Sequence, residues 1–164
     1  MSEQPAAVGK IPLKAVIDTN LFVRALMGSV VARPVLEALW GNKVQLVTSA
    51  TLLEELAEVL DRPKFTRLIR RAEAMHMLEL VAQRAEIVEP ISNPPECRDP
   101  DDRVVLATAL AGNAQLIVTA DADLRADDSL RAEMLERGVE IVGINGMLAR
   151  IEMTMGEVGG AEAG

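Results

Sequence analysis

The chain has 164 residues, of which 49% are apolar, and carries a formal net charge of −8. That length suits one domain with a buried core, and the acidic balance argues against indiscriminate attraction to polyanions, which accompanies basic surfaces. A single cysteine excludes an internal disulfide, and a single histidine excludes the Cys-rich or His-rich cages that zinc prefers. Any metal site in this chain must therefore use oxygen ligands.

No stretch of the chain has the features of a membrane span or an export signal. Apolar runs stay well short of the ~20 residues that a spanning helix needs, and the opening residues lack the charged start and apolar core of a signal peptide. We therefore expect a cytoplasmic protein without membrane contact. The stretches 1–13 and 155–164 are expected to be flexible tails around one domain at 14–154.

Short β-branched runs alternate with helical patterns between these tails. The predicted strands cover 14–18, 44–49, 85–90, 115–119 and 139–144, and the clearest helical patterns cover 31–40, 51–60, 72–84, 102–111 and 129–137. This alternation predicts an α/β fold in which helices cover both faces of a mainly parallel sheet of about five strands. The stretch 49–84 holds more helix than a minimal crossover requires, which predicts an extra helical hairpin bent at Pro63.

Four carboxylates occupy strand ends or helices in this pattern. Asp18 closes the first strand, Asp121 follows the apolar run LIVT, Asp102 begins a small-residue helix, and Glu55 lies inside the helix at 51–60. Acids gathered beyond the strand ends of an α/β sheet repel one another, so such a cluster requires hard cations to neutralise it. The pattern therefore predicts a divalent-metal site.

Several of these acids also have a purely local interpretation. Asp18 is followed by Thr19 and Asn20, and all three are common helix-capping types that could equally hydrogen-bond a ligand. Glu55 has the equally acidic neighbour Glu54, and spacing alone does not decide which one faces inward. A solvated helical face is the plain alternative for either glutamate.

The two aspartate-rich segments leave similar choices open. Asp99 and Asp101 precede Asp102, and three acids exceed what one helix cap requires, so Asp102 is the one expected to face the strand ends. Asp123 follows Asp121 by two residues, and a turn role and direct metal ligation are equally open for it.

Four segments together resemble a known family. AVIDTNLFVRALMG, LLEELAEVLDRPKF, RDPDDRVVLATALAG and LIVTADADL are similar, in this order, to the signature segments of PIN-domain nucleases, and the similarity runs from about Lys14 to Ile151. It is strongest to the VapC-like toxins of type II toxin–antitoxin pairs. The resemblance implies a three-layer α/β/α PIN-like domain and a Mg²⁺- or Mn²⁺-dependent ribonuclease. It also implies an RNA substrate, an antitoxin partner and a homodimer.

The same resemblance assigns roles to individual residues. Residues that would match the family's site are the acids and their polar companions Asp18, Asn20, Glu55, Asp102, Asp121 and Thr119. Thr119 would match the hydroxyl that positions an acid or the substrate. The chain departs from the family pattern at Ala120, where glycine is frequent, and at Arg24, where a small residue is common and where arginine could alter access to the site.

The chemistry of phosphodiester hydrolysis fits this set of acids. The reaction needs an activated water and stabilisation of charge on the leaving oxygen, and one or two Mg²⁺ ions held by carboxylates supply both. We expect Asp18, Asp102 and Asp121 to be direct or water-bridged ligands. Glu55 would bind a second ion or orient the attacking water.

A basic segment, RPKFTRLIRR, follows the helix of Glu55 and is the candidate RNA contact. Its cationic residues are Arg62, Lys64, Arg67, Arg70 and Arg71, and the last three are expected on one helical face. A phosphate track and an exposed helix paired with nearby glutamates are both open interpretations. The alternative function is a non-catalytic regulatory or binding protein whose acidic groove holds a basic partner segment.

Overall fold

A five-stranded, all-parallel sheet organises residues 12–163, the part of the chain that the computed structural model describes, with side chains from 12 to 156. The strand order is β3-β2-β1-β4-β5. The strands are β1 (Leu13–Ile17), β2 (Val44–Thr48), β3 (Glu86–Ile87), β4 (Leu116–Val118) and β5 (Glu140–Val142). The predicted parallel sheet of about five strands is confirmed.

Two separate apolar cores cover the two faces of the sheet because side chains alternate along each strand. Ala15 and Ile17 of β1 belong to one core, whereas Val16 between them belongs to the other. The first core takes side chains from helices α1 (Thr19–Leu26), α2 (Arg33–Trp40), α3 (Ala50–Leu60), α5 (Arg71–Arg84) and α9 (Ile144–Ala163). The second takes them mainly from α6 (Arg103–Ala111), α7 (Ala122–Ala126) and α8 (Asp128–Glu136). The three-layer α/β/α fold is therefore confirmed.

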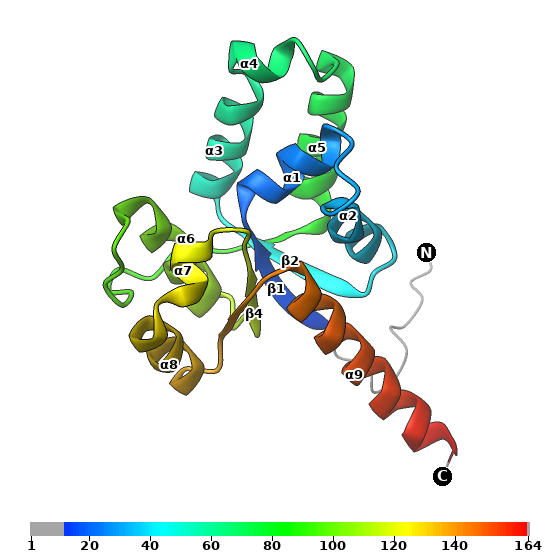
Figure 1. The fold of residues 1–164 in the computed structure, drawn as a ribbon, viewed down its shortest axis with the longest axis vertical. Coiled ribbons are helices and arrows are strands. Elements are labelled where there is room, and N and C mark those ends of the chain that lie inside the picture. The colour runs from blue at the N-terminus through cyan, green and yellow to red at the C-terminus, as the bar shows by residue number, and fades with distance from the viewer. Residues whose placement is uncertain (1–11, 164) are drawn as a thin grey trace.

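The stretch between β2 and β3 forms the predicted helical hairpin. Helices α3 and α5 pack against each other, and the short helix α4 (Pro63–Thr66) joins their ends, with Pro63 at its first position (Figure 1). The expectation that Arg67, Arg70 and Arg71 share one helical face is wrong. The chain leaves α4 at Thr66, and Arg70 has an extended backbone with φ −64° and ψ 139°, so no continuous helix connects these arginines.

Helix α9 is an element that the sequence patterns do not predict. It starts at the end of β5 and runs outward from the sheet (Figure 1). Its helical assignment continues to Ala163, into the stretch expected to be a tail, whose flexibility stays a prediction. The other expected tail falls on residues 1–11, outside the described residues, and on the start of β1 at Leu13. None of the described helices is long and apolar enough to span a membrane.

The order of the strands places a switch point between β1 and β4. From β1 the chain moves to β2 and β3 on one side, then crosses to β4 and β5 on the other. Connections therefore leave the carboxyl ends of β1 and β4 in opposite directions and open a crevice there, where ligands of open α/β sheets bind. The backbone N–H of Asp18 donates to the carbonyl of Val118 at 2.9 Å and ties the two strand ends together.

The close approach of α6 to the sheet generates a stability prediction. A Cβ on Gly112, at the end of α6, would overlap a methyl group of the fully buried Val47 in β2. Gly112→Ala should lower the free energy of unfolding by about 1–3 kcal/mol, since added volume in a packed core forces neighbours to move. Denaturant unfolding measures this change.

Gly156→Ala is the matched control for Gly112→Ala. Gly156 lies in α9, and a Cβ there would meet nothing within 4 Å. Helix propensity then makes the substitution neutral or stabilising by up to about 1 kcal/mol. Equal midpoints for the two alanine variants would contradict the packing argument.

Candidate active site

The carboxyl ends of β1 and β4 are joined by a buried hydroxyl. Asp18 follows β1, and its Oδ2 accepts a hydrogen bond from the Thr119 hydroxyl at 3.0 Å. Thr119 follows β4, is only 1% exposed, and accepts a hydrogen bond from the backbone N–H of Asp121 at 3.0 Å. One threonine thus holds both the Asp18 carboxylate and the backbone at Asp121 in place. Asp18 also caps α1, because its Oδ1 accepts a hydrogen bond from the backbone N–H of Asn20 at 3.4 Å. Asp18 therefore serves both as a helix cap and as a carboxylate at the strand end.

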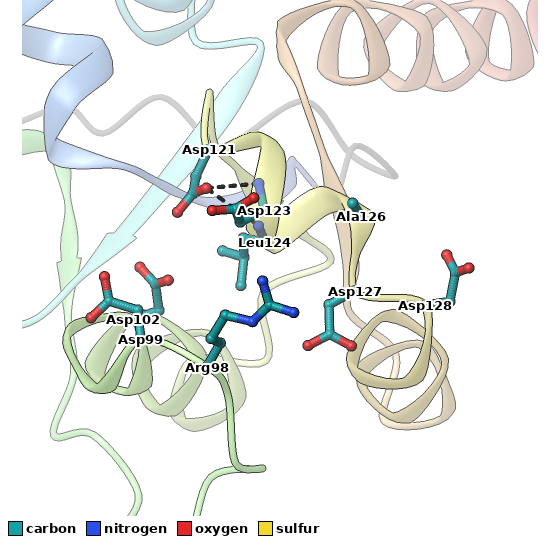
Figure 2. A pocket seen from close by; sticks show the side chains of 9 residues that line it. All are labelled: Arg98, Asp99, Asp102, Asp121, Asp123, Leu124, Ala126, Asp127 and Asp128. Carbon is teal, nitrogen blue, oxygen red and sulfur yellow. Dashed lines mark hydrogen bonds between the residues drawn. The ribbon is translucent and has the colours of Figure 1, made fainter.

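Asp121 caps the short helix α7. Its Oδ1 accepts hydrogen bonds from the backbone N–H groups of Asp123, at 2.9 Å, and Leu124, at 3.3 Å (Figure 2). The cap commits one carboxylate oxygen and leaves Oδ2 without a protein donor among the described residues. Asp123 itself is exposed and does not line the cavity that Asp18 lines. Its main observed role is therefore in the turn that Asp121 caps.

Helix α3 contributes Glu55 to the same region. Glu55 Oε2 accepts a hydrogen bond from the hydroxyl of Thr19, the first residue of α1, at 2.8 Å. Thr19 is buried, so this bond fixes the carboxylate against α1. The neighbouring Glu54 is exposed and lies outside the cavity. The choice between the two glutamates that the sequence leaves open is thus decided by helix orientation.

Asp102 reaches the region from a one-turn 3₁₀ helix, η1 (Pro100–Asp102), directly before α6. Two hydrogen bonds stabilise this turn. The Asp99 carboxylate accepts one from the backbone N–H of Asp101 at 3.0 Å, and the Asp99 carbonyl accepts one from the Cys97 thiol at 3.1 Å. Burial and neighbouring acids raise the pKa of the Cys97 thiol, which keeps it protonated and agrees with a loop role.

All four predicted acids line one cavity of about 350 Å³, here called the acid cavity. Its polar lining comes from the end of β1 and α1, from α3 and the α3–α4 connection, from the η1 turn, and from the segment after β4. The polar lining residues are Asp18, Thr19, Asn20, Arg24, Glu55, Arg62, Asp99, Asp101, Asp102 and Asp121. A neighbouring cavity of about 330 Å³, the Arg98 cavity, shares Asp99, Asp102 and Asp121 with it (Figure 2). The crevice at the switch point is therefore strongly anionic.

The electrostatic effect of this crowding is visible at Asp102. Desolvation by burial, followed by the charges of Asp121, Asp99, Asp18 and Asp101, raises the pKa of its carboxyl from 3.8 to about 6. Within residues 12–156, no salt bridge joins any of these acids to a lysine or arginine. The cavity therefore carries negative charge that the protein itself does not compensate.

The donor chemistry of the acid cavity fits a hard divalent cation, because carboxylates and hydroxyls are oxygen donors and no soft ligand faces it. The side chains are not gathered around a single point. In residues 12–156, no three His, Cys, Asp or Glu side chains form a group that could hold a metal ion as they stand. The acids share a cavity, and ligation of one ion would draw them closer together.

The basic segment that the sequence singles out is dispersed. Arg62 lines the acid cavity, Lys64 lies over the Phe65 ring at 5.1 Å, and Arg71 lines a different cavity between α3 and α5. Arg67 and Arg70 are exposed. None of the five forms a salt bridge within the described part of the chain, so the interpretation as a helix paired with glutamates is not supported. Arg98, which the sequence does not single out, lines the cavity named after it.

The raised pKa of Asp102 gives a pH-dependent stability without metal. Because its folded pKa exceeds the unfolded value, its favourable contribution is present below pH 3.8 and is lost as the pH rises through about 6. Metal-free Asp102→Asn should therefore be more stable than wild type at pH 7.5, by about 1 kcal/mol after screening at this partly exposed position. The difference should shrink at pH 5. Urea unfolding in chelator measures it, and a pH-independent difference would contradict the assignment.

Comparisons with known proteins identify the family of the chain. The family model described as PIN domain matches residues 14–123. An uncharacterised protein of Methanocaldococcus jannaschii is 30% identical over 117 residues, covering 70% of this chain and 75% of that protein. A solved structure, VapBC2 from Rickettsia felis bound to a DNA fragment from its promoter, aligns with a TM-score of 0.48 and 18% identity, over 79% of this chain and 98% of that one. The chain belongs to the PIN-domain family, whose members are generally nucleases.

Proposed function

We propose that this protein is an endoribonuclease that uses Mg²⁺ or Mn²⁺ to hydrolyse RNA phosphodiester bonds in the acid cavity. The observation that carries the proposal is the arrival of Asp18, Glu55, Asp102 and Asp121, from four separate segments, in one cavity at the switch point of the sheet. No lysine or arginine among residues 12–156 forms a salt bridge with these acids, and a divalent ion would neutralise their charge. Membership in a family of nucleases supports the reaction class.

In this proposal Asp18, Asp102 and Asp121 hold the divalent ion, directly or through water. Glu55 holds a second ion or orients the attacking water. A bound ion would supply charge neutralisation and a more acidic water. Asp123 is a further candidate ligand, although its exposure and its position outside the acid cavity favour a structural role.

Two threonines prepare the cavity for this task. Thr119, after β4, orients the Asp18 carboxylate by a hydrogen bond, and Thr19, in α1, orients the Glu55 carboxylate in the same way. Both threonines are buried, so these hydrogen bonds are protected from competing water. Without an ion the cavity repels phosphate, which makes RNA binding depend on the metal.

The biological setting that we propose is the toxin component of a type II toxin–antitoxin pair, acting in the cytoplasm. The support is the resemblance of the four sequence segments to VapC-like toxins. The same resemblance supports a cognate antitoxin protein and a homodimer. Of the basic residues proposed to contact RNA, Arg62 is the one that lines the acid cavity, while Lys64, Arg67, Arg70 and Arg71 would contact a longer RNA outside it.

A non-catalytic role is the second candidate. The acid cavity would then hold a basic segment of a partner protein, and the observation in its favour is the spacing of the acids, which are not grouped for an ion as they stand. Arginine or lysine side chains of a partner would neutralise the same negative charge. Metal-dependent cleavage of RNA separates the two candidates.

Asp18→Asn is the direct test of the catalytic proposal. Cleavage of total RNA by the variant in Mg²⁺ or Mn²⁺ should fall roughly a hundredfold or more, because one carboxylate ligand is lost. The new 5′ ends in purified-protein incubations report the cleavage. Glu54→Gln is the control, since this exposed residue lies outside the acid cavity, and it should cleave like wild type. Equal trace cleavage by wild type and Asp18→Asn would assign the activity to a contaminant.

Thr119 is a positioning residue in this scheme, and its test depends on the hydroxyl alone. Thr119→Val removes the donor to Asp18 and the acceptor for Asp121 while keeping the shape, so the cleavage rate should fall about 10- to 100-fold. Thr119→Ser keeps the hydroxyl and should recover most of the rate. If serine and valine lose activity equally, the loss comes from packing and the positioning role is wrong.

A further inference from the structure

A third cavity adjoins the acid cavity on the side of α9. It has a volume of about 540 Å³ and lies between the α1–α2 connection, the segment after β4 and the start of α9. Arg24 and Ala120 line both this cavity and the acid cavity, and Thr119 forms part of its wall. A chain-like ligand bound at the acids could therefore continue into this space without leaving the surface.

The charged residues that line this third cavity are both arginines, so it is here called the arginine cavity. Arg24 lies in the last turn of α1, and Arg125 lies in α7, four residues after Asp121. Both side chains are exposed, and neither forms a salt bridge within the described residues. Two guanidinium groups therefore face the solvent of this cavity without a carboxylate partner.

Arg125 packs closely against Gly143. A Cβ on Gly143 would lie 3.0 Å from Nη1 of Arg125 and 3.5 Å from its Cζ, so the guanidinium lies directly against the backbone before α9. A Cβ at position 143 would require the guanidinium to shift by a few tenths of an ångström. Arg125 thus extends from α7 to the segment between β5 and α9, where it lines the arginine cavity.

The Arg98 cavity also adjoins the acid cavity and has the reverse charge. The Arg98 cavity adds the exposed or half-buried Asp123, Asp127 and Asp128 to the aspartates it shares with the acid cavity, and Arg98 is its one cation (Figure 2). The aspartates of the Arg98 cavity repel a phosphate that leaves the acid cavity, whereas Arg24 and Arg125 attract it. The charge difference defines a direction for a bound polyanion.

We propose that Arg24 and Arg125 bind phosphates of the RNA strand next to the bond that is cleaved, and so direct the strand from the acids across Ala120 toward the start of α9. This inference rests on the proposed function. A guanidinium binds phosphate oxygens through two parallel N–H donors and reads no base, so the contact positions the strand without specifying its sequence.

The arginine cavity also has an apolar rim. Val30 and Val31 line it and are 73% and 74% exposed. A protein partner could cover such a rim, but a partner matched to it would need acidic groups for Arg24 and Arg125. The continuity of this cavity with the acids, through Arg24 and Ala120, favours the RNA strand. Occupation by a protein instead is an outcome of the test below.

The test measures RNA binding without cleavage. In a Glu55→Gln background with Mg²⁺, which keeps the three aspartate ligands, fluorescence anisotropy of a labelled single-stranded RNA of about 12 nucleotides gives Kd across a series of salt concentrations. Arg24→Gln and Arg125→Gln should each weaken binding about five- to tenfold at low salt and reduce the salt slope by about 0.7, the value for one lost phosphate contact on a single strand. Arg131→Gln, an exposed arginine of α8 outside these cavities, should change Kd less than about twofold.

The outcomes separate this inference from the proposed function. If wild type cleaves RNA and Asp18→Asn does not, while both arginine variants keep the Kd and the salt slope, the inference alone is wrong and the cavity serves another ligand, such as a protein. If wild type shows no metal-dependent cleavage, the proposed function fails and the inference fails with it. Arg24→Lys, which keeps the charge, should retain the salt slope and guards against a variant that unfolds.

Discussion

Mutual repulsion among carboxylates at the switch point is the constraint on which the rest of this structure depends. β1 and β4 are neighbours whose connections leave in opposite directions, so the residues after them, Asp18 and Asp121, end at one crevice. Asp102 and Glu55 enter the same crevice from η1 and α3. Burial of Asp102, together with the charges of its acidic neighbours, raises the pKa of its carboxyl to about 6.

The fold tolerates this repulsion because hydroxyls and a rigid sheet hold the acids where they are. Thr119 and Thr19 bind one carboxylate each and are themselves buried against the strands and helices. A hydroxyl satisfies a carboxylate oxygen without cancelling its charge. Arginine partners at the same positions would stabilise the metal-free protein and remove the negative field that, in the proposed function, attracts a divalent ion. On that proposal, the uncompensated acids lower stability at the site and serve its function.

The features that the sequence predicts correctly are those that depend on the local pattern of apolar residues. The unbroken apolar runs AVI and LIV indicate strands buried on both faces. The acids that follow them reach one edge of the sheet because β1 and β4 are parallel. Helix α9 is not predicted because its apolar stripe is weak. Only Met147 and Ile151 of its described side chains belong to the buried core, and Gly146 and Gly156 interrupt the pattern. The helix is interrupted between Arg67 and Arg71 by a turn that the apolar periodicity does not indicate.

Which acid faces the cavity, and where cationic groups gather, depends on tertiary geometry. Glu55 turns inward and Glu54 outward because Leu56 and Val59 orient α3 on the core. Spacing along the chain favours RPKFTRLIRR as the basic track, yet only Arg62 of that segment lines the acid cavity. Arg24 and Arg125 are about a hundred residues apart in the sequence and line one cavity, since α1 follows β1 and α7 follows β4. The same switch point that concentrates the acids therefore also brings together the cations beside them, so attraction and repulsion of a polyanion arise from one topological feature.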